Sequence, residues 1–532
     1  MKRSAFSKLI TLLLSAALIL GVLSGCAGSA PEAGPDEPDE TQLPPEPVQV
    51  QTSDGKFTLR CSPGRSFNPF FGDDEQNLLL SSLLYEGLFR VDRSFAPHPV
   101  LCKRYTVSED GLIYTLTLLS DVKLTDGSTL SAEDAVYSID LARESDRYKN
   151  RLSGIEECEA TGDLTLEITL ESPNASLPAL LDFPIVKADT GENELPVGTG
   201  PFFMARTGSP LMGAYKNYRD YDKLPLHEIY LTDFEDTALS ESFAEQRLDL
   251  VWDDTGDGNH LLLRGNYEVR GYTTTILQYI GFNTVADHLD DPELRRAMSL
   301  AIDRSALVRD AFDGGGVPAV LVLPKAHWLY DETWEAGFGY SPDACAAVQK
   351  KLGLLEKTGD AFLDFPSGGG KYKRAYFDFI VNSDNSAKVD AARAVAQQLR
   401  LAGFDVRLNI LSWEEFLKRL SNGNFDMYYA EVGLSPDFDL NPILSYGGSL
   451  DFGYAGRERY EELIDAFLSS ADDTAKKAAA RALCREIASD APIIPLIYRE
   501  HEISTYRGAV MGAEPSVSGV FCGFTDWSID LD

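Results

Sequence analysis

The sequence lacks most of the signals that mark an enzyme or a metal site. Its six histidines are scattered singly, and none pairs with another at a spacing of three or four residues, so a metal site on one helix is not predicted. It contains no Gly-x-Ser-x-Gly segment and no Cys-x-x-Cys segment. A metal site built from distant histidines stays open. Abundant carboxylates alone define no acid–base pair, so we expect a binding protein without a cofactor rather than an enzyme.

Basic side chains are scarce relative to acidic ones. The chain has 48 lysines and arginines against 83 aspartates and glutamates, which gives a formal net charge of −35. Such a surface repels nucleic acid and anionic lipid headgroups, so we expect no nucleic-acid partner. The length of 532 residues is too great for one compact core, and two or three domains are expected.

The cysteines give no pairing signal. One of the seven, Cys26, belongs to the leader described next. Pairing outside the cell and sparse buried thiols are equally compatible with the spacing of the other six, so their disulfide state stays open. These six residues are Cys61, Cys102, Cys158, Cys345, Cys484 and Cys522.

The N-terminal segment is typical of a secretion signal. A positively charged end precedes an apolar run over residues 9–23, which is too short and too rich in small residues for a membrane span. The run ends in Leu23-Ser24-Gly25-Cys26, which resembles the bacterial lipobox, whose cysteine receives a diacylglyceryl group. We expect residues 1–26 to be a lipoprotein signal peptide and Cys26 the lipid-attachment site. A buried thiol near a plain cleavage site is the alternative.

Residues 27–51 are rich in proline and acid and almost free of large apolar side chains. Such a segment buries too little surface to order itself, so we expect a disordered tether. At about 3.1 Å per residue it reaches at most roughly 75 Å from the membrane.

Residues 279–308 combine a strand signal with a marked helix start. Asp291 can cap a helix in which Pro292 takes the first position, and apolar residues then recur at spacings of three and four as far as Val308. Arg295 and Arg304 are expected on the wet side of this helix, as are Arg296 and Asp303. Other predicted elements are a helix over 77–88, a capping box of Ser131 with Asp134, and a strand–helix–strand unit over 375–410 with Gly403 ending its helix.

Several motifs follow one another in a recognisable order along the folded part. They are Leu84-Tyr85-Glu86-Gly87-Leu88, Pro196-Val197-Gly198-Thr199-Gly200-Pro201-Phe202, Tyr279-Ile280-Gly281-Phe282-Asn283-Thr284 and Ala491-Pro492-Ile493-Ile494-Pro495. The Gly-Thr-Gly loop in the second motif is not expected to bind phosphate, because no Gly-Lys-Ser/Thr follows it. The motifs resemble those of the extracellular solute-binding proteins of peptide-type ABC importers, which include oligopeptide-, dipeptide- and nickel-binding relatives.

This resemblance implies an α/β fold of the two-lobed periplasmic-binding-protein type, with a hinge and an additional small α+β domain. Closure on a ligand would be a hinge motion. The implied bounds are 52–85, 196–272 and 495–532 for a discontinuous lobe I, 86–195 for the additional domain, and 273–494 for lobe II.

The resemblance also implies a function. The protein would be a lipid-anchored monomer outside the cell that captures peptides or similar small solutes and delivers them to the membrane subunits of an ABC permease. Two alternatives stay open, which are a surface-anchored peptide hydrolase and a binder of nickel complexes or other non-peptide solutes.

The expected ligand site follows from the same resemblance. Peptide-binding relatives carry an aspartate that accepts the peptide's α-ammonium, and Asp437 fits that position best, with Asp439 as the alternative. The backbone of Glu431, Val432, Gly433 and Leu434 would hold an extended peptide by β-augmentation. This chain lacks the tryptophan of the family's motif. A plain structural role for the two aspartates, stabilising a proline-containing turn, is the competing interpretation.

Overall fold

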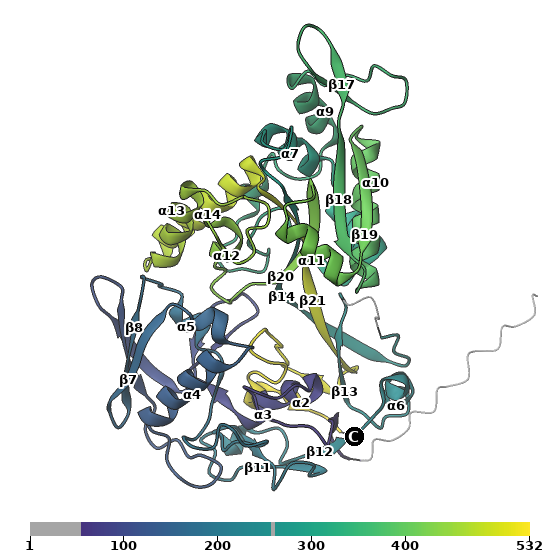
Figure 1. Ribbon diagram of the computed structural model, residues 1–532. Coiled ribbons are helices and arrows are strands. Elements are labelled where there is room, and N and C mark those ends of the chain that lie inside the picture. The colour runs from purple at the N-terminus through teal and green to yellow at the C-terminus, as the bar shows by residue number, and fades with distance from the viewer. Residues whose placement is uncertain (1–54, 257–260, 532) are drawn as a thin grey trace, which may run out of the picture. The chain divides into compact units, whose positions relative to one another are not determined.

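The computed structural model describes residues 55–256 and 261–531, which Figure 1 traces as ribbons. The predicted signal peptide, the tether and Cys26 lie outside the described residues. Among the helices that are described, none is both long and apolar enough to cross a membrane.

Two long strands form the centre of the fold. β14 (Tyr267–Phe282) and β21 (Ile493–Tyr506) pair antiparallel over most of their length. Their register shifts between Thr273 and Leu277, and such a bulge bends a strand and increases its twist. The two halves of this strand pair therefore run in different directions and lie in different lobes. Figure 1 shows it passing from one lobe to the other.

The strand pair lies inside a seven-stranded sheet of order β13-β21-β14-β20-β18-β19, with β15 also paired to β21. β18 and β19 are parallel and are joined by α10 (Ser386–Leu401), which confirms the predicted strand–helix–strand unit. Gly403 follows α10 with φ 93°, as predicted of a glycine that ends a helix. The further strands are β13 (Leu250–Asp254), β15 (Gly316–Pro318), β18 (Tyr376–Asn382), β19 (Asp405–Leu411) and β20 (Met427–Gly433).

The first lobe holds two four-stranded sheets, whose strands run in the orders β1-β12-β11-β10 and β5-β6-β8-β7. One continuous apolar core, from Phe57 to Trp527, joins side chains of both sheets. The predicted capping box is confirmed, because the Ser131 and Asp134 side chains each accept from the other's backbone N–H at the start of α4. The strands are β1 (Thr58–Arg60), β5 (Cys102–Val107), β6 (Ile113–Leu118), β7 (Ile155–Gly162), β8 (Thr165–Leu170), β10 (Phe202–Phe203), β11 (Leu211–Ala214) and β12 (Glu228–Thr232).

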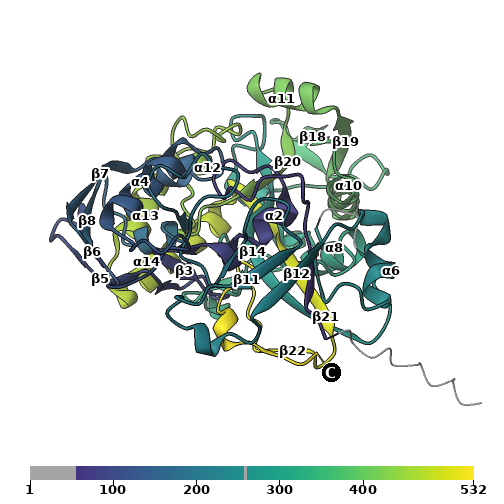
Figure 2. The same cartoon turned by 90° about the horizontal axis from the view of Figure 1, so that it is seen from below.

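Short elements connect these sheets. The helices are α2 (Glu75–Leu79), α3 (Ser81–Leu84), α4 (Ala132–Glu144), α5 (Leu177–Leu180), α6 (Leu239–Ala244), and the short 3-10 turns η1 (Lys149–Leu152), η2 (Tyr221–Lys223), η3 (Asp236–Ala238) and η5 (Phe524–Asp526). The short strands are β2 (Glu86–Gly87), β3 (Phe89–Val91), β4 (Pro97–Pro99), β9 (Pro184–Ile185), β22 (Val510–Met511) and β23 (Ser528–Ile529). Figure 2 shows β5 to β8 on one side and β18, β19 and α10 on the other.

The second lobe has an apolar core on each face of its sheet. Tyr428 contributes to one core and its neighbour Tyr429 to the other, because alternate side chains of a strand point to opposite faces. α13 and α14 cover one face and α7, α8 and α10 the other. The helices are α7 (Pro292–Leu300), α8 (Arg304–Ala311), η4 (Glu332–Glu335), α9 (Pro342–Lys351), α11 (Trp413–Ser421), α12 (Asn441–Leu444), α13 (Glu458–Ser469) and α14 (Asp473–Asp490), with a hairpin of β16 (Asp364–Pro366) and β17 (Tyr372–Arg374).

Two predicted helices are wrong in extent. The helix expected over 77–88 ends at Leu84, because the chain becomes extended at Tyr85 and the next two residues pair with β9. The helix expected from Pro292 to Val308 is broken after Leu300. Asp303 starts α8 there by accepting from the Ala306 N–H at 3.0 Å. Tertiary pairing and capping override a continuous apolar pattern in both places.

The expectation that Arg295 and Arg304 face water is also wrong. Each side chain is buried, with 3% of the residue exposed. The Nε of Arg295 donates to the Ala491 carbonyl at 2.9 Å, and that of Arg304 to the Pro495 carbonyl at 2.8 Å. Backbone carbonyls at the junction of α14 and β21 thus replace water around two charges. Burial lowers the pKa of the Arg304 guanidinium to about 10.

Close packing of β14 on β20 predicts a sharp cost for one added methyl group. In Gly281→Ala the new Cβ would lie 2.0 Å from the ring of Tyr428, which is 2% exposed and has no room to move. We expect the free energy of unfolding to fall by roughly 1–3 kcal/mol, as for other overpacked cores. Urea titration would measure it. The control is Gly433→Ala on the paired strand, where no atom lies within 4 Å of the new Cβ. An equal loss in both variants would contradict this account.

Candidate functional site

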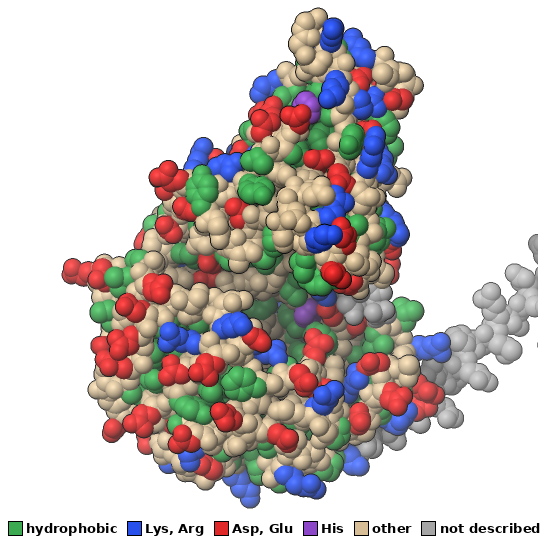
Figure 3. Space-filling view, in the orientation of Figure 1, with side chains coloured by type: hydrophobic (Ala, Val, Ile, Leu, Met, Phe, Trp, Pro, Cys, Tyr) green, Lys and Arg blue, Asp and Glu red, His purple; other side chains and the backbone are tan. Residues whose placement is uncertain are grey.

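The surface is hollowed between the two lobes. Figure 3 shows this hollow, with a histidine and charged side chains inside it. The sheet strands β13, β14, β20 and β21 meet where the lobes join, so their side chains are the natural place to look for a ligand site.

One edge of β20 is open where a ligand strand was predicted. β20 pairs with β14 along its whole length, from Ile276 opposite Gly433 to Phe282 opposite Met427. On its other edge it pairs with β18 only at Met427 and Tyr428. Within the described part of the chain, no strand pairs with that edge beyond Tyr428. Unpaired backbone groups of this kind can accept an added strand.

The residues whose backbone was predicted to hold a peptide differ in how accessible they are. Val432 is half-buried and Gly433 is exposed, so both are within reach of a ligand. Leu434 is buried at 7% exposure and packs into a core of the second lobe. Its N–H donates to the Thr275 carbonyl at 3.1 Å, so its backbone N–H is already taken.

Glu431 lies in a cluster of half-buried charges around the buried Arg499. Its carboxylate is 3.2 Å from the Arg499 guanidinium and 2.9 Å from the Lys388 ammonium. It also accepts from the Gln278 amide at 2.9 Å. On its other side Arg499 pairs with Asp254. Three strands and α10 therefore bring two cations and two anions together at the junction of the lobes, and β14 adds the neutral Gln278.

His501 completes this charge cluster without adding a charge. Its Nε2 lies 3.5 Å from a carboxylate oxygen of Asp254. Burial lowers its pKa to about 4, with Asp254 opposing that shift and Arg499 adding to it. The imidazole is therefore neutral near pH 7. The Nε of Arg499 and the Nε2 of His501 are buried and have no hydrogen-bond partner among the described residues, so two polar atoms of the cluster are left for another group.

Asp437 lies in the loop after β20 and links the lobes. Only 5% of the residue is exposed. One carboxylate oxygen accepts from the Asn174 amide of the first lobe at 2.8 Å, and the other accepts from the Ser435 hydroxyl and from the Asp439 N–H. Asp437 thus stabilises its own turn, as the competing interpretation expected, and also joins a segment of the other lobe.

Lys476 adds an internal positive charge that sequence reasoning missed. This residue of α14 is 8% exposed, and its ammonium donates to the Phe467 carbonyl at 3.1 Å. Burial lowers its pKa to about 8, and the charge of Asp437 opposes that shift. The signal was present in the sequence, since Lys476 lies four residues before buried Ala480, on the apolar stripe of its helix.

The neighbours of Asp437 in its loop have distinct roles. Burial and the charge of Asp437 raise the pKa of Asp439 to about 6, and its carboxylate accepts from the Asn441 N–H at 2.9 Å. The backbone of Phe438 has φ 58°, a conformation that residues other than glycine rarely adopt. Its ring packs edge-on against Phe95 of the first lobe and His327 of the second, each at 5.0 Å between ring centres. The loop is therefore held in one shape by packing.

Cysteines and carboxylates form no further site in the described chain. The six cysteines that the structure describes are free thiols, and burial raises the pKa of each. Over the same residues, no group of three His, Cys, Asp or Glu side chains is arranged to hold a metal ion.

Two α/β lobes, crossed by two long strands and enclosing a charged recess, define a two-lobed solute-binding protein. The family model of bacterial extracellular solute-binding proteins, family 5 (middle part), matches residues 96–453. The chain belongs to this family, and the predicted two-lobed α/β fold is confirmed.

Three distant relatives align with nearly the whole chain. The oligopeptide-binding protein AppA of Bacillus subtilis is 22% identical and aligns with 93% of this chain and 94% of its own. Its structure with a nonapeptide has a TM-score of 0.61, at 20% identity over 90% of this chain and 99% of that one. The unliganded open form of the murein tripeptide-binding protein MppA has a TM-score of 0.73, at 18% identity over 89% and 97%. NikZ of Campylobacter jejuni, solved with Ni(L-His), has a TM-score of 0.62 at 19% identity over 89% and 99%. At these identities the structures show the shared fold.

Removing the central cation of the charge cluster should destabilise the protein strongly. Arg499→Met leaves Glu431 with Lys388 alone and Asp254 beside a neutral histidine. Breaking a buried ion pair in this way costs about 3–5 kcal/mol. Lys388→Met is the matched control, because Arg499 still neutralises Glu431, and we expect a loss of about 1 kcal/mol or less. Denaturant titration at pH 7 would compare them. Equal losses would show that Arg499 has no special place in the cluster.

Proposed function

We propose that this protein captures extended peptides between its lobes and delivers them to the membrane subunits of an ABC permease. Membership of the extracellular solute-binding family supports delivery of a solute, and similarity to the oligopeptide-binding protein AppA supports peptides as the class of solute. The observation that carries the proposal is the open edge of β20 beside a buried carboxylate.

The open edge supplies contacts that do not depend on peptide sequence. Backbone groups of Val432 and Gly433 would pair with an extended chain, as in other β-augmentation complexes. Glu431 would take part mainly through its backbone, because its carboxylate is occupied by Arg499 and Lys388. Leu434 would form part of the apolar wall beneath the bound peptide, since its side chain is buried.

Asp437 would fix the end of the peptide. We infer that the α-ammonium competes with the Asn174 amide for the same carboxylate oxygen. Lys476 already provides part of the counter-charge that Asp437 needs, so the gain from a second ammonium is smaller than for an isolated buried aspartate. Asp439 is the alternative anchor, two residues along.

The protein would act as a monomer outside the cell, held to the membrane through the lipid on Cys26. The charged, apolar and lipobox order of the leader supports this anchor. Two acyl chains are enough for stable anchoring, whereas one is marginal.

Asp437→Asn should weaken peptide binding by about tenfold to a hundredfold, since a charge-assisted hydrogen bond is worth roughly 1.5–3 kcal/mol. Calorimetry would compare the variant with the wild type, using a peptide that co-purifies with the protein and is identified by native mass spectrometry. The wild type should bind the N-acetylated form of that peptide as weakly as the variant binds the free form.

Equal affinity of the wild type for both forms would remove the ammonium anchor. A loss confined to Asp439→Asn would shift the anchor by two residues. Co-purification of a nickel complex, or cleavage of the peptide during the titration, would favour one of the two alternative functions.

Cys26→Ala should move the protein from the membrane fraction to the medium, because the lipid then has no attachment atom. Fractionation and intact mass of the released protein would measure this. Cys158→Ala is the control, since it removes a half-buried thiol far from the leader and should leave the protein in the membrane fraction. A Cys26→Ala protein that stays membrane-bound, with a wild type that carries no lipid, would contradict the anchor.

A further inference from the structure

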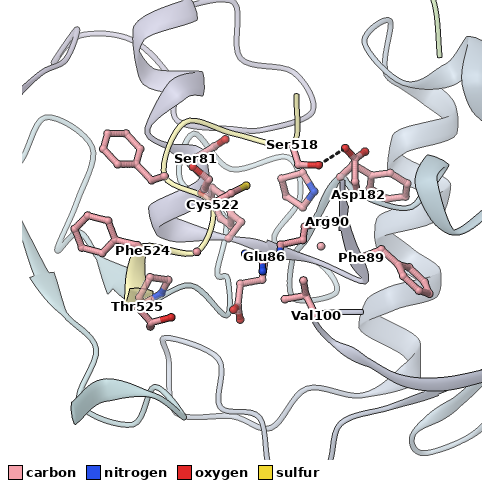
Figure 4. A pocket seen from close by; sticks show the side chains of 18 of the residues that line it. Ser81, Glu86, Phe89, Arg90, Val100, Asp182, Ser518, Cys522, Phe524 and Thr525 are labelled. Atoms are coloured by element: carbon pink, nitrogen blue, oxygen red, sulfur yellow. Dashed lines mark hydrogen bonds between the residues drawn. The ribbon is translucent and has the colours of Figure 1, made fainter. Parts of the chain in front are cut away.

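A second cavity lies wholly within the first lobe and shares no residue with the charge cluster or the Asp437 loop. It has a volume of about 350 Å³. Its walls come from α3, β2, β3, η1 and β9, and from the C-terminal segment 517–526. Figure 4 shows these side chains around a common space. A cavity of this size fits a small organic molecule rather than a peptide.

The walls of the cavity are mixed, with aromatic rings beside charged groups. Phe89, Phe183, Phe521 and Phe524 are all buried and line the space. Tyr148 packs against Phe183 at 5.5 Å between ring centres. Rings in this arrangement offer an apolar surface to the body of a ligand.

Two of the three arginines in the walls are already paired. Both terminal nitrogens of Arg219 donate to Glu86, each at 2.6 Å. Arg151 lies 2.7 Å from Asp182, whose other oxygen accepts from the Ser518 hydroxyl. Within each of these two pairs the positive and the negative charge cancel, so neither pair contributes a net charge to the cavity.

The third guanidinium, that of Arg90, has no carboxylate partner in the described part of the chain. Figure 4 shows Arg90 in the middle of the view, with Glu86 and Cys522 to one side and Asp182 to the other. A Cβ built on Gly523 would lie 2.9 Å from a terminal nitrogen of Arg90, so the left-handed glycine leaves room for this group. The same built Cβ would lie 3.5 Å from a carboxylate oxygen of Asp526, so this acid lies near the guanidinium without pairing with it.

Other polar atoms of the walls also lack partners. The Ser82 hydroxyl and the Arg151 Nε are buried without a hydrogen-bond partner among the described residues. Two further acids reach the cavity, but Asp220 is 2.7 Å from Lys223 and Asp526 is exposed to solvent, which screens its charge. The walls as a whole carry four acids against three arginines, and Arg90 is the one guanidinium among them without a carboxylate partner in the described residues.

We propose that this cavity binds a small organic carboxylate with an apolar body, independently of the peptide site. Arg90 meets the carboxylate, with the Ser82 hydroxyl and Arg151 Nε as further donors. The aromatic rings contact the apolar part. An inorganic anion would leave those rings without a partner, and a cation would face the unpaired charge of Arg90.

Isothermal titration of the wild-type protein with phenylacetate tests the proposal, with phenylacetamide as the uncharged match. Phenylacetate should bind with saturation below about 1 mM, as expected for a ligand with few atoms. Phenylacetamide should bind at least about tenfold more weakly, because its amide lacks the charge that Arg90 meets.

Arg90→Gln should lower the affinity for phenylacetate by at least about tenfold, since the carboxylate of the ligand loses the unpaired guanidinium that it meets in the cavity. Arg93→Gln is the matched control. It removes an equal charge three residues along the chain, but the Arg93 side chain is paired with Glu514. Asp437→Asn should leave phenylacetate binding unchanged, which separates this site from the peptide site.

Three results would overturn the proposal. The first is no saturable binding of phenylacetate up to about 10 mM. The second is equal affinity for the acid and the amide. The third is an equal loss in Arg90→Gln and Arg93→Gln, which would indicate a general effect of surface charge.

Discussion

The antiparallel ladder between β14 and β21 is the constraint on which the rest of the fold depends. Its hydrogen bonds continue through both lobes. Its register shifts twice, between Thr273 and Leu277, where the lobes join, and between Gln278 and Tyr279. β13, β15 and β20 pair directly with these two strands, and β18 and β19 continue the sheet through β20. A bulge is a place where a ladder can bend without losing its other bonds. The same ladder therefore links the lobes and contains a place where a strand pair can bend.

Buried charge at this junction has a cost that the surrounding groups offset. Arg499 and Glu431 are neutralised by each other and by Asp254 and Lys388, in a site that is only partly exposed to water. Such clusters rarely stabilise a protein more than apolar side chains would, but they require particular partners at particular positions. The cluster thus fixes how β13, β20, β21 and α10 meet, beside the edge where a ligand would lie.

The sequence predicts the elements of the fold better than the surroundings of their charged side chains. The strand–helix–strand unit before Leu411 and the cap at Ser131 follow from local patterns, and the structure contains both. The burial of Arg295, Arg304 and Lys476 does not follow, because their partners are backbone carbonyls or residues distant in sequence. A charged residue on the apolar stripe of a helix indicates from the sequence that the charge is buried, but the partner of that charge cannot be identified without the fold. The position of the candidate site along the chain therefore stays a prediction, and its charge pairing could not be predicted without the fold.

The free thiols carry a consequence for how this protein reaches its folded state. All six cysteines of the described chain are unpaired, although the family works outside the cell. No covalent link in these residues has to form before the lobes pack, so the slow steps of thiol oxidation and disulfide exchange are absent from their folding. The folded part should consequently assemble as readily in a reducing cytoplasm as in an oxidising compartment, and reductants should leave its stability unchanged.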